Sequence, residues 1–82
     1  MAKQSIQGIV TRAGAPVGGA YVRLHGPSGE FVSEQYTQDE GTFTFFVAEG
    51  AWDLQVRATD TADVSQTIEV VGNEVPVHIE LT

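Results

Sequence analysis

Residues 18–25 read Gly-Gly-Ala-Tyr-Val-Arg-Leu-His, a stretch in which apolar and polar side chains alternate after two glycines. The apolar positions are Ala20, Val22 and Leu24. The polar positions are Tyr21, Arg23 and His25. Apolar residues at every second position predict a β-strand with one buried face. The opposite face is then either a binding surface or a solvated one.

The same alternation recurs on both sides of this stretch, and short turns rich in glycine, proline and acidic residues separate the segments. The further segments are residues 6–10, 30–37, 42–48, 51–58, 64–71 and 75–81. Gly14 suits a positive φ in the first turn. Pro76 cannot donate a ladder hydrogen bond, so it is expected on an edge strand or at a strand start. Seven short strands without helical spacing predict an all-β fold, a seven-strand antiparallel Greek-key sandwich.

The inward positions of these strands define the expected core. Its large side chains are Val22, Leu24, Phe43, Phe45, Trp52 and Leu54. Phe46 falls on the outward parity of its strand, where an aromatic side chain is either a contact residue or is covered by a loop.

Length and charge limit what the protein can be. The chain has 82 residues, enough for a single domain over residues 1–82 with one core. Its net charge is -7, and its four basic residues are scattered rather than clustered. Phosphate backbones and anionic membrane surfaces are therefore unfavourable partners. No segment has the length of apolar sequence that a signal peptide or a membrane span needs, so we expect a cytoplasmic protein.

No catalytic or metal-binding signature is present. The sequence has no cysteine, no glycine-rich phosphate loop, no nucleophile elbow and no metalloprotease motif. We therefore predict no enzymatic activity, no cofactor and no metal. One alternative remains: His25 and His78, with Glu80 as carboxylate partner, would form an acid-base or metal site if their strands were adjacent.

Outward-facing aromatic and arginine residues favour a protein-binding surface, because these types are enriched at interface hot spots. The predicted contact residues are Tyr21, Arg23, His25, Phe46 and Arg57. A second alternative is a carbohydrate-binding module, which would need an exposed Trp52 to stack on a sugar.

Several motifs resemble a known group of domains. The order I-x-G-x-V, AGAPVGGAYVRL, T-x-x-x-G-T-F-x-F, EGAWDLQV and VHIEL is similar to the carboxypeptidase regulatory-like domains, which have a prealbumin-like sandwich. The segments GAYVRL, GEF, TFTFF and EGAWDL resemble the DUF1416 family of small actinobacterial proteins. Genes of that family often neighbour a thiosulfate sulfurtransferase, so the resemblance implies such an enzyme as partner. Because this chain lacks cysteine, we do not expect it to carry sulfur itself.

Overall fold

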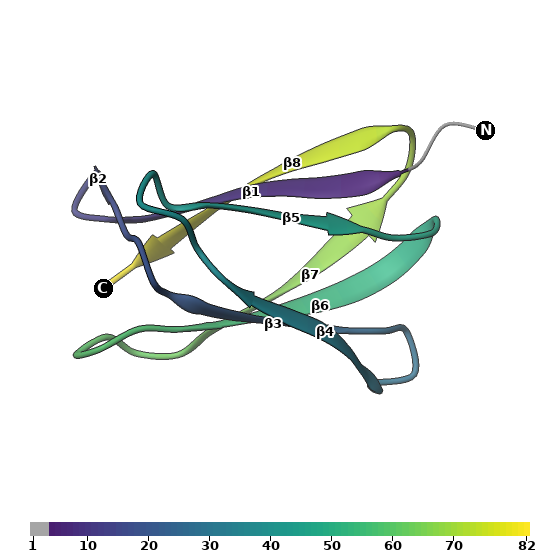
Figure 1. Ribbon diagram of the computed structural model, residues 1–82. Coiled ribbons are helices and arrows are strands. Elements are labelled where there is room, and N and C mark those ends of the chain that lie inside the picture. Colours follow the sequence, from purple (N-terminus) through teal and green to yellow (C-terminus); the bar gives the residue numbers. More distant parts are fainter. Residues whose placement is uncertain (1–3) are drawn as a thin grey trace.

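The computed structural model describes residues 4–82, which form eight β-strands (Figure 1). The strands are β1 (Ser5–Arg12), β2 (Ala15–Pro16), β3 (Tyr21–His25), β4 (Phe31–Tyr36), β5 (Thr42–Phe46), β6 (Gly50–Arg57), β7 (Val64–Val70) and β8 (Glu74–Leu81). All seven segments with alternating side chains are strands. The all-β prediction is thus confirmed.

The strands form two sheets that pack face to face (Figure 1). In the first sheet, β1 is central and pairs with β2, β5 and β8. The second sheet has the order β4-β3-β6-β7, and every pairing in it is antiparallel. The architecture is a β-sandwich in which each sheet contributes one face to the core.

Two details differ from the predicted seven antiparallel strands. The eighth strand, β2, lies within the expected first turn, where Gly14 takes a φ of 80° and lets the chain fold back on β1. The other difference is that β1 and β8 pair in parallel over the full length of both strands. Parallel pairing requires a long connection, which here is the rest of the chain, so alternation within a strand cannot reveal it. Pro76 lies in β8, which among the described strands pairs with β1 and forms an edge of the first sheet, as predicted.

The core lies between the two sheets and contains the alternating apolar residues. Its buried members are Ile6, Val10, Ala20, Val22, Leu24, Phe43, Phe45, Leu54, Val56, Ile68, Val70, Val77, Ile79 and Leu81. Trp52 is only partly buried, so its predicted place in the core is wrong in part. The indole Nε1 donates a hydrogen bond to the Ala48 carbonyl at 2.9 Å. That polar requirement holds the ring at the margin of the core.

One side chain joins the two sheets along the edges of β4 and β5. The Gln35 amide donates from Nε2 to the Thr44 carbonyl at 2.6 Å and accepts from the Thr44 amide at 3.2 Å. Both backbone groups of Thr44 on this edge are therefore satisfied within the chain. An edge strand protected in this way is a poor template for pairing with another chain.

Candidate functional site

The outer face of the second sheet gathers most of the predicted contact residues. Tyr21, Arg23 and His25 point outward from β3. Arg57 of β6 lies directly opposite Tyr21 in the β3–β6 pairing. Two further aromatic residues from β4 contact them. We call the resulting surface the aromatic face, formed by Tyr21, Arg23, His25, Phe31 and Tyr36.

The aromatic rings of this face are packed yet open to solvent. The rings of Tyr21 and Tyr36 lie 5.4 Å apart at an interplanar angle of 46°, and Phe31 meets His25 edge-on at 6.1 Å. Tyr36 is 66% exposed and Phe31 is 49% exposed. Both rings lie on the outer face of the second sheet, on the side away from the first sheet.

A β-bulge places both β4 aromatics on one face. Phe31 and Tyr36 are five residues apart, so plain alternation would direct them to opposite faces. The β3–β4 register pairs Leu24 with Ser33 and His25 with Phe31, which leaves Val32 as an extra residue. This shift brings Phe31 onto the face of Tyr36. The predicted contact residues include neither Phe31 nor Tyr36, and nothing in the alternation marks the bulge that turns Phe31 outward.

Polar contacts orient the side chains of the aromatic face. The Tyr21 hydroxyl donates to the Glu34 carboxylate at 2.5 Å. This hydrogen bond, with partial desolvation and the negative charge of Glu34, raises the pKa of Tyr21 above its ordinary value, and Arg23 opposes the shift. His25 Nδ1 lies 3.1 Å from the Gly29 carbonyl. A carbonyl only accepts, so Nδ1 carries a proton.

Phe46 does not belong to this surface, and the prediction of one patch that contains it is wrong. Its strand, β5, pairs with β1 in the first sheet, where Phe46 lies opposite Ser5. Phe46 is 69% exposed on the outer face of that sheet. Arg57 is on the predicted face, but it forms an ion pair with Asp63 at 3.1 Å.

The two histidines also lie on different sheets. His25 faces outward from β3 and His78 faces outward from β8, so the core separates their rings. The alternative of a joint acid-base or metal site is therefore wrong. Within residues 4–82, no group of three or more histidine, aspartate or glutamate side chains is arranged to hold a metal ion.

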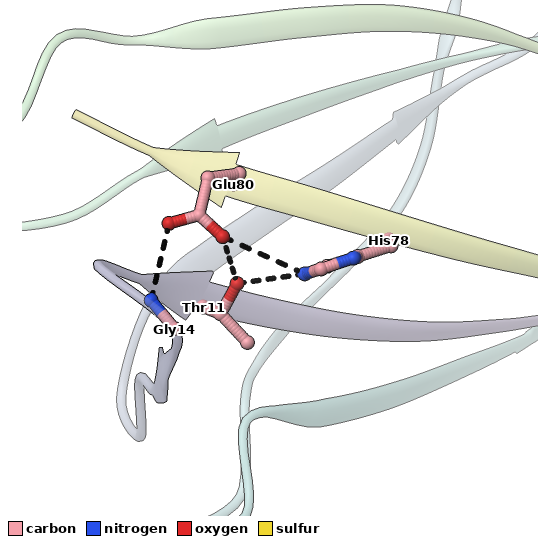
Figure 2. A network of polar contacts seen from close by, with 4 residues as sticks. All are labelled: Thr11, Gly14, His78 and Glu80. Atoms are coloured by element: carbon pink, nitrogen blue, oxygen red, sulfur yellow. Dashed lines mark hydrogen bonds and ion pairs between the residues drawn. The ribbon is translucent and has the colours of Figure 1, made fainter.

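His78 instead belongs to a polar network with Thr11 and Glu80 (Figure 2). The Thr11 hydroxyl donates to Glu80 Oε1 at 2.5 Å and lies 2.7 Å from His78 Nε2. The backbone amide of Gly14 donates to the other Glu80 oxygen at 3.4 Å. The bond from Thr11, more than the contacts with backbone amides and His78, lowers the pKa of Glu80.

This network resembles a catalytic triad in composition only. Because the one hydroxyl proton of Thr11 goes to Glu80, Thr11 must accept from His78 Nε2–H. In a triad the histidine accepts the nucleophile's proton, and the carboxylate orients the histidine from its other nitrogen. Thr11 is also only 7% exposed. These hydrogen bonds hold β8 against β1 and against the turn that follows β1, so the function of the network is structural.

An open hollow of about 360 Å³ also lies on the first sheet, over β1 between β5 and β8. Its lining residues are Gln7, Gly8, Ile9, Thr42, Phe43, Pro76, Val77 and His78. Ile9 is 37% exposed in this hollow. The lining is mainly apolar, so the hollow offers little chemistry beyond packing.

Comparisons with known proteins identify a family and a fold. Residues 1–81 match the family model described as a protein of unknown function, DUF1416. An uncharacterized protein of Mycolicibacterium smegmatis is 44% identical over 54 residues, which are 66% of this chain and 58% of that protein. An uncharacterized protein of Mycobacterium tuberculosis is 45% identical over 47 residues, or 57% and 47% of the two chains. The match spans about half the length of these curated relatives.

Two solved structures share the β-sandwich at low sequence identity. A DUF3823 family protein from Parabacteroides merdae superposes with a TM-score of 0.77 at 18% identity, covering 99% of this chain and 46% of that one. The dioxygenase domain of a dioxygenase and carbohydrate-binding protein fusion from Streptomyces sp. SirexAA-E has a TM-score of 0.76 at 11% identity, covering 98% and 79%. At such identities the likeness concerns the fold alone.

Proposed function

The chain belongs to the DUF1416 family, whose function is unknown, and we propose that it is a non-enzymatic protein-interaction module that contacts its partner through the aromatic face. The observation that carries this proposal is the exposed group of aromatic rings around Arg23 on an edge of the second sheet. Aromatic and arginine side chains are enriched among the residues that dominate the energetics of protein interfaces, because they bury large surfaces and combine apolar contact with hydrogen bonds.

Several finer expectations accompany the proposal. The resemblance to carboxypeptidase regulatory-like domains supports a prealbumin-like, Greek-key sandwich that forms a single domain over residues 1–82. The gene neighbourhood implied by the DUF1416 resemblance supports a thiosulfate sulfurtransferase as partner in the cytoplasm. Within residues 4–82, no helix has the length and apolar character that crossing a membrane requires.

A carbohydrate partner is the competing proposal, because exposed aromatic rings on a sheet also stack on sugars. Trp52 does not serve this purpose, since its ring is partly buried and its indole nitrogen bonds to the Ala48 carbonyl. Tyr36 and Phe31 would have to supply the stacking surface. Two contacts favour a protein partner: the hydrogen bond from Tyr21 to Glu34, and the position of Arg23 over the Phe31 ring.

Capture of a partner by matched surface variants tests the proposal. The immobilised protein is incubated with a purified mycobacterial thiosulfate sulfurtransferase and, separately, with a panel of soluble polysaccharides. Tyr36→Ala is expected to weaken protein capture at least about thirtyfold, as loss of an aromatic hot spot does, while changing stability by less than about 0.5 kcal/mol.

Phe46→Ala is the matched control, because Phe46 is equally exposed on the other sheet. This variant is expected to capture the partner like the wild type. If Phe46→Ala abolishes capture and Tyr36→Ala preserves it, the contact surface is the first sheet and the proposal is wrong. Binding of a polysaccharide that depends on Tyr36, without binding of a protein, would establish the carbohydrate alternative.

A further inference from the structure

Arg23 is a cation without a carboxylate partner, although one lies directly opposite. The β3–β4 register places Glu34 across from Arg23, the usual arrangement for a cross-strand ion pair. Glu34 instead accepts a hydrogen bond from the Tyr21 hydroxyl. Among residues 4–82, the ion pairs within 4.0 Å are Arg57 with Asp63 and His78 with Glu80. The charge of Arg23 is therefore not neutralised by an ion pair.

The Phe31 ring holds Arg23 in place. The guanidinium carbon lies 4.6 Å from the ring centroid, within the range of a cation–π contact. Arg23 Nε is buried and has no hydrogen-bond partner. The same ring packs against His25, whose Nε2 is also buried without a partner. Buried polar atoms are normally paired, so the Arg23 N–H is a donor that lacks an acceptor. The His25 nitrogen is different, because with the proton on Nδ1 it is itself an acceptor.

The chemistry of the Arg23 guanidinium indicates which acceptor group a partner would supply. A guanidinium presents its N–H donors in a planar fork that matches a carboxylate, and stacking on a ring leaves the edge of the fork available. The aromatic surroundings lower the local dielectric, which strengthens a contact between opposite charges. Stacking also reduces the entropy that the long side chain loses when a ligand binds.

The overall charge argues against a polyanion. The chain carries a net charge of -7, and the nearby Arg57 is already paired with Asp63. On this face, within residues 4–82, a nucleic acid or another ligand with many phosphates would meet the charge of Arg23 and general repulsion from the acidic chain. A single carboxylate next to apolar atoms suits the surface better, because Phe31 and Tyr36 can pack on those atoms.

We propose that Arg23, stacked on Phe31, is the anchor of the aromatic face and binds an aspartate or glutamate side chain that the partner protein presents beside an apolar group. This inference rests on the proposed function and specifies the chemistry of its partner. Arg23 supplies the charge and orients the carboxylate. Phe31 and Tyr36 bind the apolar neighbour.

Phenylacetate is the probe that tests this inference, because it combines one carboxylate with one apolar ring. Phenylacetamide is its neutral control, and inorganic phosphate represents tetrahedral anions. The isotope-labelled protein is titrated with each probe while NMR records the Arg23 Nε–H signal and the backbone amides of β3 and β4. Phenylacetate is expected to shift these signals in a saturable way, with an affinity at least about tenfold above that of phenylacetamide.

Two arginine variants locate the contact. Arg23→Gln is expected to reduce phenylacetate binding about tenfold, to the level of phenylacetamide. Arg57→Gln removes a cation of the same face that is already ion-paired, and it is expected to leave binding unchanged. Circular dichroism verifies that each variant is folded. If Arg23→Gln does not fold, the comparison of the three probes on the wild-type protein still decides the question.

Three results would overturn the inference: equal binding of phenylacetate and phenylacetamide, stronger binding of phosphate than of phenylacetate, or unchanged phenylacetate binding by folded Arg23→Gln. The proposed function fails separately, through the capture experiment. Partner capture that requires Tyr36 but survives Arg23→Gln would retain the aromatic face as an interface and reject its carboxylate anchor.

Discussion

Alanine in place of Gly8 is expected to destabilise the protein, because its methyl group enters the space that the Phe43 ring occupies. Gly8 of β1 lies directly across from Phe43 of β5. A Cβ atom on Gly8 would lie 2.0 Å from the ring Cζ atom, whereas ordinary contact begins at 3.4 Å. The ring must therefore move by roughly 1.4 Å to relieve the overlap. Phe43 is buried, so such a shift displaces packed neighbours.

The expected loss is about 2 kcal/mol of unfolding free energy. Overpacking in a core costs about 1 to 3 kcal/mol. Replacing glycine by alanine reduces the entropy of the unfolded chain, which offsets about 0.4 to 1 kcal/mol where the backbone is compatible. The steric clash at Gly8 involves three ring carbons, so we place its cost at the upper end of that range. The melting temperature should then fall by about 8 to 16 °C in a domain of this size.

A double-mutant cycle with Phe43→Leu tests the reasoning by urea denaturation, followed through Trp52 fluorescence. The shorter leucine side chain makes room for the new methyl group, although it costs about 1 to 2 kcal/mol by itself. The double variant should be more stable than the two separate losses predict, by about 1 kcal/mol or more. An unchanged denaturation midpoint for Gly8→Ala, or strict additivity in the double variant, would refute the proposed clash.

Trp52→Ala should lower the free energy of unfolding by about 2 kcal/mol in thermal unfolding, because the ring is only partly buried. A loss of about 3 to 5 kcal/mol, typical of a fully buried tryptophan, would mean that the ring belongs to the core. The pKa of the Glu80 carboxylate is lowered in the folded state, so its contribution to stability is present above the ordinary value of 4.5 and is lost as the pH falls through the lowered pKa. Urea titrations should accordingly show a weaker loss of stability in acid for Glu80→Gln, and an unaltered pH profile would contradict this reasoning. Gln35→Glu removes the amide donor to the Thr44 carbonyl and should cost about 1 to 3 kcal/mol, whereas Glu34→Gln on the same strand leaves that bond intact and serves as the control; equal effects of both would reject the bond's importance.

The contact surface shows how far alternation alone can place functional residues. Tyr21, Arg23 and His25 share one strand, so their common outward face follows from their spacing. Phe46 is equally outward by parity, yet it lies on the other sheet, because parity says which side of a strand a residue occupies and not which sheet the strand joins. Phe31 joins the surface through a bulge, which depends on the pairing of two strands.

The sequence by itself determined the succession of strands and turns, the inward parity of the core and the absence of thiol chemistry, because these depend on neighbouring residues and composition. Tertiary structure alone decided the parallel pairing of β1 with β8, the separation of His25 from His78, and the position of Arg23 over Phe31. Each of these depends on contacts between residues distant in the chain. Local periodicity carries information about one strand's two faces, and strand pairing is selected by the packing of the whole core.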